Sequence, residues 1–296
     1  MTQRPAPLRV AFLGPAGTYS DEALRASAPP GPLEAVPFPT LWETIIAVQR
    51  GEVDRAVVPI ENALEGSVPA TLDALAVEAT GVRIAAEVVH PIHHCLIAGR
   101  PLALERIERV VSHPQATAQC ARFLRERLSG AARESSASTA EAVRTVVATA
   151  EPWAALGSRL AAEIHGGEVL LEGVEDHVDN ATRFVWLAPR DAVGATEPAA
   201  TKTSIVFWGF NDTSPGALVA VLAELADRRV NLTKIESRPS RVRLGHYMFF
   251  VDLDGAEGDA PVGDALEALA RRVEVLRVLG SYGRLPLRQG PHATVP

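Results

Sequence analysis

The order and spacing of the expected strands and helices change near residue 200, and this change constrains the fold of the chain more than any other sequence feature. Up to about residue 189, short β-branched segments alternate with longer helical ones, a pattern typical of α/β architecture with largely parallel sheets. The expected strands are Leu8–Leu13, Ala56–Ile60, Val82–Val89, Val110–Ser112, Trp153–Gly157 and Phe184–Leu187. The expected helices are Thr40–Arg50, Ala70–Ala79, Gln115–Leu128 and Thr139–Ala150.

The C-terminal part follows a different order of elements. The expected strands are Ser204–Phe210, Val230–Arg238, His246–Leu253 and Val275–Tyr282, with helices over Pro215–Arg228 and Val262–Val273. This βαββαβ order is the ferredoxin-like motif. Residues 190–201 are small, polar and aperiodic, which is typical of a linker. We therefore predict two domains, residues 8–190 and residues 202–285.

Composition excludes several classes of function. The net charge is −7 and no cluster of lysine or arginine stands out, so the sequence shows no basic segment of the kind that binds nucleic acid. The N-terminal residues contain no apolar segment of the kind found in a signal peptide, and no apolar run approaches the length of a membrane helix. Cys95 and Cys120 are the only cysteines, and we expect them to be reduced and buried. We expect a cytoplasmic protein.

Two strand ends resemble one another. Leu13-Gly14-Pro15 and Ser112-His113-Pro114 each end a strand with a proline turn and open a helix. This indicates two similar α/β lobes whose strand-end loops face a shared crevice, where ligands bind in open α/β sheets. In the first loop, G-P-A-G-T-Y-S, exposed amides would suit a carboxylate or phosphate, although a plain strand-to-helix turn explains the same residues.

Three further motifs place polar groups at strand ends. They are P-I-E-N-A-L-E-G-S from Pro59, S-H-P-Q-A-T-A-Q-C from Ser112, and N-A-T-R-F from Asn180. The last brings an amide, a hydroxyl and a guanidinium together, but a strand cap with a surface arginine explains it as well. His90, His93, His94 and Cys95 match no standard zinc spacing and lie in an apolar, strand-like run. No P-loop, paired-cysteine motif or serine-nucleophile elbow is present.

The ordered set G-P-A-G-T-Y-S, P-I-E-N, S-H-P-Q and T-R-F resembles the prephenate dehydratase family over roughly residues 9–282. The resemblance implies a two-lobed, periplasmic-binding-protein-like catalytic domain followed by a ferredoxin-like ACT regulatory domain. It implies an enzyme of L-phenylalanine biosynthesis that converts prephenate to phenylpyruvate with loss of water and CO₂. Because no chorismate mutase module precedes residue 8, the form expected is the monofunctional one. No cofactor or metal is implied.

The resemblance also implies site residues. Thr182 would be the catalytic hydroxyl, with Arg183 beside it to orient the substrate or the Thr182 loop. Asn62, Ser112, Gln119, Thr18 and Glu61 would bind substrate. Neutral polar groups suit a ring carboxylate that loses its charge as CO₂ leaves, because a salt bridge to it would stabilise the ground state. A single arginine would hold the side-chain carboxylate, whose charge persists.

The ACT domain is expected to bind L-phenylalanine as an allosteric effector, between paired ACT domains of a homodimer or homotetramer. The residues implied are Gly216, Ala217, Leu218, Asn231, Leu232, Glu236, Ser237, Arg238 and Pro239. Amides at the helix start near Gly216 would suit the carboxylate of an amino acid.

Two positions depart from the family pattern, and two alternative functions stay open. Position 63 is Ala where the family often has Ser or Thr, and position 181 is Ala where a bulky Phe is common. Arogenate dehydratase is an alternative, since arogenate differs from prephenate by an amino group in place of a keto group and no residue decides between them. A non-catalytic two-lobed solute-binding protein fused to a sensor domain is the other alternative, and it would not need the full ordered motif set.

Overall fold

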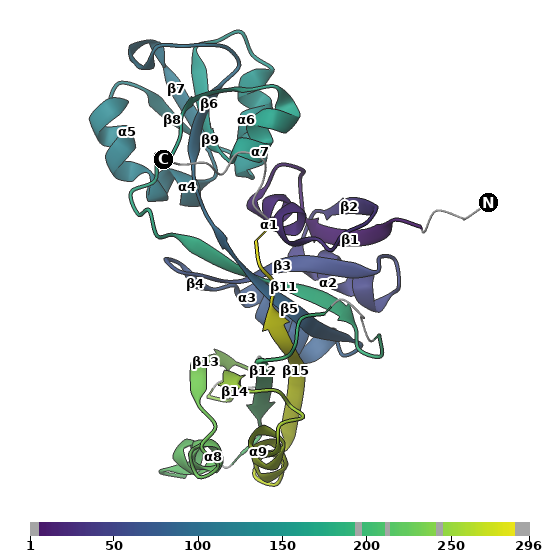
Figure 1. The fold of residues 1–296 in the computed structure, drawn as a ribbon. Helices are drawn as coiled ribbons and strands as arrows, with labels where there is room; N and C mark the ends of the chain where they lie inside the picture. The colour runs from purple at the N-terminus through teal and green to yellow at the C-terminus, as the bar shows by residue number, and fades with distance from the viewer. Residues whose placement is uncertain (1–5, 193–196, 211–213, 241–244, 288–296) are drawn as a thin grey trace, which may run out of the picture.

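The computed structural model describes residues 6–192, 197–210, 214–240 and 245–287. The chain forms two α/β lobes and a third unit that lies beyond the first lobe (Figure 1). The chain crosses between the two lobes twice, once after β5 (Val82–Pro91) and once before β11 (Ala181–Pro189). These two crossings place the loops of both lobes around one cleft.

The first lobe contains a mixed sheet in the order β2-β1-β3-β11-β5. Its remaining strands are β1 (Leu8–Leu13), β2 (Leu33–Phe38), β3 (Arg55–Asn62) and the short β4 (Gly66–Ser67). Its helices are α1 (Tyr19–Ser27), α2 (Leu41–Gln49), α3 (Pro69–Asp73) and the π-helical turn η1 (Ala74–Glu78). The expected helix over residues 70–79 is thus an α-helix that continues as a π-turn.

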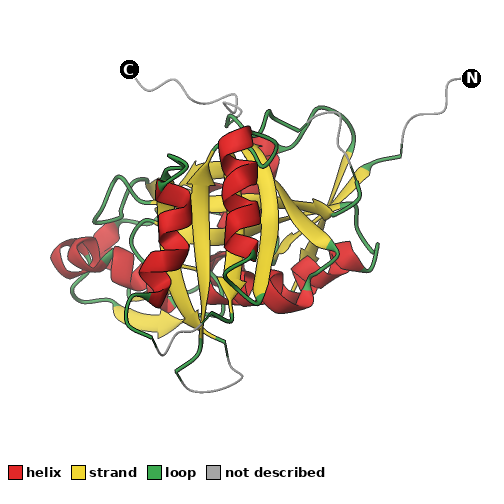
Figure 2. Cartoon of the chain, turned by 90° about the horizontal axis from the view of Figure 1, so that it is seen from below, coloured by secondary structure: helices red, strands yellow, loops and turns green. Residues whose placement is uncertain are grey.

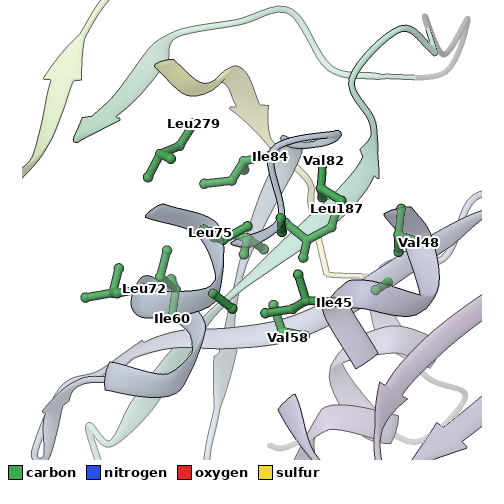
Figure 3. Packing of buried hydrophobic residues seen from close by; sticks show 14 of the residues in the cluster. Ile45, Val48, Val58, Ile60, Leu72, Leu75, Val82, Ile84, Leu187 and Leu279 are labelled. Carbon is green, nitrogen blue, oxygen red and sulfur yellow. The ribbon is translucent and has the colours of Figure 1, made fainter. Parts of the chain in front are cut away.

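This sheet is buried on both faces, which explains its nearly continuous apolar strands. On one face Val58 and Ile60 pack against Ile45 of α2 and Leu72 of α3 (Figure 3). On the other face, Phe12, Val57 and Phe184 pack against Leu24 of α1. Alternate residues of one strand therefore belong to two different cores, and a polar residue within such a strand faces one side or the other.

The second lobe contains a five-stranded sheet in the order β10-β6-β9-β7-β8. Its strands are β6 (Cys95–Ala98), β7 (Arg109–Ser112), β8 (Ala132–Ser135), β9 (Trp153–Gly157) and β10 (Glu168–Leu171). Its helices are η2 (Leu104–Arg106), α4 (Pro114–Gln119), α5 (Ala121–Arg127), α6 (Thr139–Val147) and α7 (Arg159–His165).

Two expectations for the lobes need correction. The predicted single helix over 115–128 is two helices that meet at Cys120, because the carboxylate of Asp176 accepts hydrogen bonds from the amides of Arg122 (2.9 Å) and Phe123 (3.3 Å) and caps the second helix. The sheets are also mixed rather than largely parallel. In the first lobe, β11 returns from the second lobe and inserts between β3 and β5, antiparallel to both.

The third unit has the predicted βαββαβ order. It consists of β12 (Lys202–Trp208), α8 (Ala217–Ala226), β13 (Leu232–Pro239), β14 (Tyr247–Asp254), α9 (Ala260–Ala270) and β15 (Val275–Arg284). The strands lie in the ferredoxin-like order β13-β14-β12-β15. Both helices cover the face of this sheet that points away from the lobes (Figures 1 and 2).

The other face of this third sheet packs on the first lobe. Met248, Phe250 and Leu279 belong to the same apolar cluster as Leu72 and Leu75. The end of β15 also pairs with β5 in parallel, with Gly283 opposite Ala86, so the two sheets are continuous. The predicted linker, residues 190–201, lies partly outside the described residues, at 193–196. Its described part is attached to the first lobe, since Glu197 of the linker pairs with Arg83 of β5 at 2.8 Å.

Gly280 marks the crossing of β15 over β5. A Cβ added there would lie 2.2 Å from the backbone carbonyl oxygen of Ile84, so Gly280→Ala must move the backbone. We expect a loss of roughly 1–3 kcal/mol in the free energy of unfolding, measured by urea denaturation. Gly258→Ala is the control, because its added Cβ meets nothing within 4 Å. Equal stability of the two variants would contradict this account of the domain junction.

Candidate functional site

A cleft of about 400 Å³ lies between the two lobes. The first lobe contributes Leu13, Gly14, Thr18, Tyr19, Ser20, Pro39, Leu41, Pro59, Asn62, Val68, Thr182 and Phe184. The crossing segment after β5 contributes Ile92 and His94, and the second lobe contributes His113, Gln115, Ala116, Gln119, Ala137, Ser138 and Thr139. No lysine, arginine, aspartate or glutamate is among these described residues. The cleft is therefore lined by amides, hydroxyls and histidines set among apolar side chains, without a carboxylate or a permanent cation.

The loops that face the cleft come from the two proline turns noted in the sequence. Gly14 follows β1, and His113 and Gln115 follow β7. Three nine-residue helices also begin here: α1 after Thr18, α2 after Thr40, and α6 after Ser138. Because helix N-termini present unpaired N–H groups and positive dipole ends, the cleft favours anionic groups without any formal cation.

Thr182 and Asn62 form the central pair of the cleft. They are opposite one another on the antiparallel strands β11 and β3, and Asn62 Nδ2 donates to Thr182 Oγ1 at 2.9 Å. The orientation of the Asn62 amide is determined by the backbone, since its Oδ1 accepts from the amides of Leu64 and Glu65, both at 3.0 Å. Nδ2 must then be the donor, so Thr182 Oγ is an acceptor toward Asn62 and its own proton remains to be donated elsewhere.

The same logic orients a chain of side chains across the cleft. Asn62 Nδ2 also donates to Asn180 Oδ1 at 2.9 Å, so Asn180 Nδ2 must donate to Gln119 Oε1, at 3.1 Å. Gln119 Oε1 then accepts from His94 Nε2 at 3.0 Å. His94 Nδ1 lies 2.6 Å from the hydroxyl of Tyr19, which also lies 3.0 Å from the carbonyl oxygen of His93. Two backbone amides thus determine the direction of every bond as far as His94 Nε2.

Burial, rather than the direction of the hydrogen bonds, favours the neutral form of His94. Burial lowers the pKa of His94 below its ordinary value, although the hydrogen bond to Gln119 acts in the opposite direction. The imidazole ring also packs edge-on against Tyr19, with ring centroids 5.4 Å apart. Sequence reasoning placed His94 in an apolar strand-like run and did not assign it to the site, and it missed Tyr19 as well. Neither residue carries a spacing signal that connects it to Thr182.

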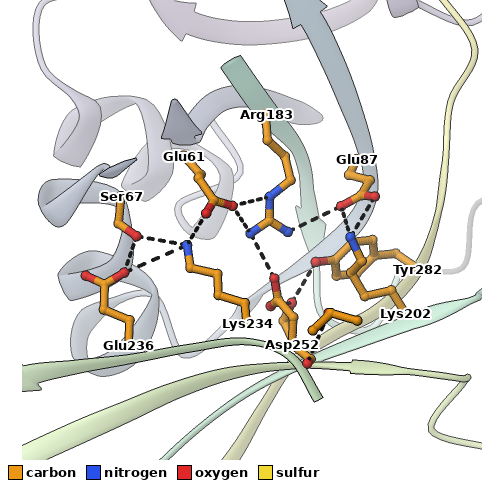
Figure 4. Close-up of polar contacts among 11 residues, drawn as sticks. Glu61, Ser67, Glu87, Arg183, Lys202, Lys234, Glu236, Asp252 and Tyr282 are labelled. Carbon is orange, nitrogen blue, oxygen red and sulfur yellow. Dashed lines mark hydrogen bonds and ion pairs between the residues drawn. The ribbon is translucent and has the colours of Figure 1, made fainter. Parts of the chain in front are cut away.

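Two of the predicted site residues, the catalytic candidate Arg183 and the substrate-binding candidate Glu61, lie outside the cleft. Arg183 and Glu61 are next to Thr182 and Asn62 in sequence, but their side chains lie on the opposite face of the same two strands (Figure 4). There the Arg183 guanidinium pairs with Glu61 at 2.9 Å and does not line the cleft. The physical reason is the two-residue period of a strand, which points neighbouring side chains to opposite faces. The geometry does not support Arg183 or Glu61 as a substrate contact.

The hydroxyls of Ser112 and Thr18 both donate to backbone carbonyl groups of other residues. Ser112 is fully buried, donates to the carbonyl of Leu156 at 2.8 Å and does not line the cleft, so its role is to hold β7 against β9. Thr18 does line the cleft, but its hydroxyl donates to the carbonyl of Leu13 at 2.9 Å. Thr182, Asn62, Gln119 and Thr18 are therefore the predicted site residues that the fold brings together.

The predicted effector residues divide between two surfaces of the third unit. Glu236 and Arg238 face the first lobe, where Glu236 contacts Ser67 and Arg238 pairs with Asp73 at 2.8 Å. Ser237 and Pro239 alternate with them and are exposed, as is Gly216 at the start of α8. The remaining predicted residues lie along α8 and at the start of β13: Ala217, Leu218, Asn231 and Leu232. Asn231 is exposed and donates to Asp254 at 2.7 Å.

Both cysteines are unpaired and buried, as expected from the sequence. Burial raises the pKa of the Cys95 thiol to about 11, so it is not a thiolate near neutral pH. Within the described parts of the chain, no helix is long and apolar enough to cross a membrane.

Comparison with known proteins identifies the family. The family model for prephenate dehydratase matches residues 10–192, and that for the ACT domain matches residues 205–271. The chain belongs to the prephenate dehydratase family. Among curated relatives, a prephenate dehydratase of Amycolatopsis methanolica is 40% identical over 277 residues, covering 93% of this chain and 88% of that protein. The arogenate dehydratase/prephenate dehydratase 2 of Arabidopsis thaliana is 38% identical, covering 93% of this chain and 72% of that protein.

Solved structures agree with this assignment. A prephenate dehydratase of Arthrobacter aurescens in complex with L-Phe superposes with a TM-score of 0.84 at 37% identity, covering 97% of this chain and 94% of that one. A protein described as a novel type of quorum-quenching acylase, GqqA, gives a TM-score of 0.82 at 34% identity, covering 94% of this chain and 98% of that one. The chain thus has the two-lobed fold and the C-terminal ACT domain that its sequence predicts.

His94 should make the stability of the enzyme depend on pH in a defined direction. Because burial lowers its pKa, the unfolded chain takes up this proton at a higher pH than the folded chain. The free energy of unfolding should therefore decrease as pH falls below about 6.5, the value of an unperturbed histidine, until the folded-state pKa is passed. Denaturation at a series of pH values should show a shallower decrease for His94→Gln than for the wild-type enzyme.

The control for this measurement is His177→Gln, because His177 is exposed and its loss should leave the wild-type slope unchanged. A His94→Gln enzyme with the same acid dependence as the wild type would contradict a neutral, buried His94.

Proposed function

We propose that Thr182 donates the proton that the departing hydroxyl of prephenate requires, as prephenate becomes phenylpyruvate, water and CO₂, and that the Thr182 alkoxide then takes up a proton from solvent. The observation that carries this proposal is the direction of the Asn62–Thr182 hydrogen bond. Asn62 Nδ2 donates to Thr182 Oγ1 at 2.9 Å, which leaves the Thr182 proton free to point into the cleft. Donation to Oγ also draws electron density from the hydroxyl and so increases its acidity.

The charge distribution of the cleft suits this reaction. The ring carboxylate loses its charge as CO₂ forms, so a cation held against it would stabilise the substrate more than the transition state. The described lining is uncharged except for its histidines and is rich in amides and hydroxyls. The sequence analysis expected a single arginine to hold the side-chain carboxylate. With no arginine among the described lining residues, that role falls in this proposal to backbone amides at the starts of α1, α2 and α6.

Thr182→Ala tests the role of the hydroxyl. We expect kcat to fall about 10²–10⁴-fold with a smaller change in KM, because an interaction used mainly in the transition state is removed. The measurement is the ultraviolet absorbance of phenylpyruvate formed from prephenate. Thr80→Ala, at an exposed position, is the control and should retain wild-type kcat. A Thr182→Ala enzyme with near-normal kcat would remove Thr182 from the mechanism.

The choice between prephenate and arogenate depends on a keto or an amino group in the substrate side chain. Curated relatives of this chain carry both names, with identities of 40% and 38% for the two described above. We propose prephenate as the substrate, because a protonated amino group gains most from a carboxylate and none is among the described lining residues. The kcat/KM ratio on the two purified substrates decides this, and a ratio that favours arogenate reverses the assignment.

The ACT domain is the proposed site for L-phenylalanine. The relative from Arthrobacter aurescens was solved in complex with L-Phe, and this chain is similar to it over 97% of its length. In this chain the exposed edge strand β13 presents Ser237, while the exposed Gly216 opens α8, whose amides suit a carboxylate. β13 lies at the edge of its sheet, so a second ACT domain could pair there and complete the site in a homodimer or homotetramer.

Calorimetric titration of the full chain with L-phenylalanine tests this proposal. Ser237→Ala should weaken binding by about 1 kcal/mol, roughly fivefold, if its hydroxyl contacts the amino acid. Ser129→Ala, an exposed serine in the second lobe, should leave the affinity unchanged. Absence of heat with the wild-type chain at millimolar L-phenylalanine would count against the effector site altogether.

A further inference from the structure

The face of β3 and β11 opposite the cleft carries a cluster of ionic side chains that connects the catalytic and ACT domains. We call it the Arg183 cluster; it comprises Arg183, Glu61, Glu87, Asp252, Lys202 and Lys234 (Figure 4). The Arg183 guanidinium pairs with Glu61 at 2.9 Å, with Asp252 at 2.8 Å and with Glu87 at 3.3 Å. Asp252 belongs to β14 of the ACT domain, whereas the two glutamates belong to the first lobe.

The Arg183 side chain is only 10% exposed, so these pairs are shielded from solvent. Burial acts to lower the pKa of the guanidinium, but Asp252, Tyr282, Glu61 and Glu87 together raise it above its usual value. Arg183 is thus a permanent cation whose planar donors must meet carboxylates in defined directions. The three carboxylates therefore restrain the position of the guanidinium at the end of the Arg183 side chain.

Asp252 is itself held firmly by the ACT sheet. Its Oδ1 accepts from Ser204 Oγ at 2.5 Å, and Ser204 Oγ lies 2.6 Å from the hydroxyl of Tyr282. These three side chains come from the neighbouring strands β14, β12 and β15. Tyr282 is 1% exposed. The position of the Asp252 carboxylate therefore follows the position of the ACT sheet.

The cluster acts on the strand pair that carries the catalytic hydroxyl. In the register of β3 and β11, Thr182 is opposite Asn62 and Arg183 is opposite Glu61. The first pair faces the cleft and the second faces the ACT domain. Lys234, on β13, contacts Glu61 at 3.4 Å, so the ACT domain contacts both members of the second pair.

We propose that Asp252 and Lys234, both in the ACT domain, are positioning residues for the Thr182–Asn62 pair. They hold the backbones of β11 and β3 from behind, through Arg183 and Glu61. The inference rests on the proposed role of Thr182. An ACT domain bound in this way is a structural part of the catalytic site, and not only a sensor attached to it.

Asp252→Asn is the primary test, because the change is nearly isosteric and leaves Arg183 paired with Glu61 and Glu87. We expect kcat on prephenate to fall about tenfold with KM changed less than about twofold, the effect of a displaced catalytic group. The matched control is Asp254→Asn, since Asp254 lies two residues further along β14 and is exposed. Identical kcat values for these two variants would overturn the proposal.

A double mutant separates positioning from general damage. If Asp252 acts through Thr182, adding Asp252→Asn to Thr182→Ala should leave the residual rate unchanged. An equal loss in both backgrounds would overturn the proposal in favour of a merely structural role.

Lys234→Gln is a second variant that does not depend on the folding of Asp252→Asn. It removes one of the two cations that contact Glu61 and leaves the pairing with Arg183, so it should lower kcat in the same sense but by less. Wild-type kcat in Lys234→Gln would remove Lys234 from the proposal.

Hydrogen exchange of the peptide that spans β11 supplies a readout besides activity. We expect Asp252→Asn to accelerate exchange there relative to Asp254→Asn, and wild-type protection would overturn the proposal. This measurement stays informative if the wild-type chain turns over neither prephenate nor arogenate. In that case the proposed function fails, while the exchange data still decide whether Asp252 holds β11.

Discussion

The antiparallel pairing of β3 with β11 is the constraint on which the rest of the structure depends. β11 reaches the first lobe only after the chain has built the whole second lobe, and it then inserts between β3 and β5. This insertion closes the first lobe and sets the second lobe across the cleft. It also brings Asn62 and Thr182, 120 residues apart in sequence, into hydrogen-bond contact. Without this pairing the motifs of the two lobes would have no common site.

The polar network of the cleft is ordered by a small number of backbone groups. Asn62 Oδ1 accepts from two backbone amides, and this determines which atom of each following side chain donates. A buried network has a unique arrangement only when every member is satisfied, and here the direction of each bond is determined as far as His94 Nε2. The result is a cleft in which neutral groups have defined donor directions, as a reaction that loses a carboxylate charge requires.

The two faces of the β3–β11 strand pair carry side chains of different kinds. On the cleft face the groups are neutral, whereas on the ACT face they are ionic and pair Arg183 with three carboxylates. The alternation of side chains along a strand places these sets back to back, separated only by the backbone. The ACT sheet is also continuous with the first sheet through β15 and β5. Only the backbone of one strand pair therefore separates the contacts made by the ACT domain from the cleft face.

Hydrophobic periodicity and turn residues are local signals, and they predicted the α/β alternation and the βαββαβ order. The ordered motifs also indicated the family and placed Thr182, Asn62, Gln119 and Thr18, which do line the cleft. The face that each neighbouring side chain occupies follows from the tertiary fold. It took Arg183 and Glu61 out of the cleft, buried Ser112 and brought in His94 and Tyr19. The physical reason is that strand register and the return of β11 depend on contacts between residues far apart in sequence, for which a local pattern carries no signal.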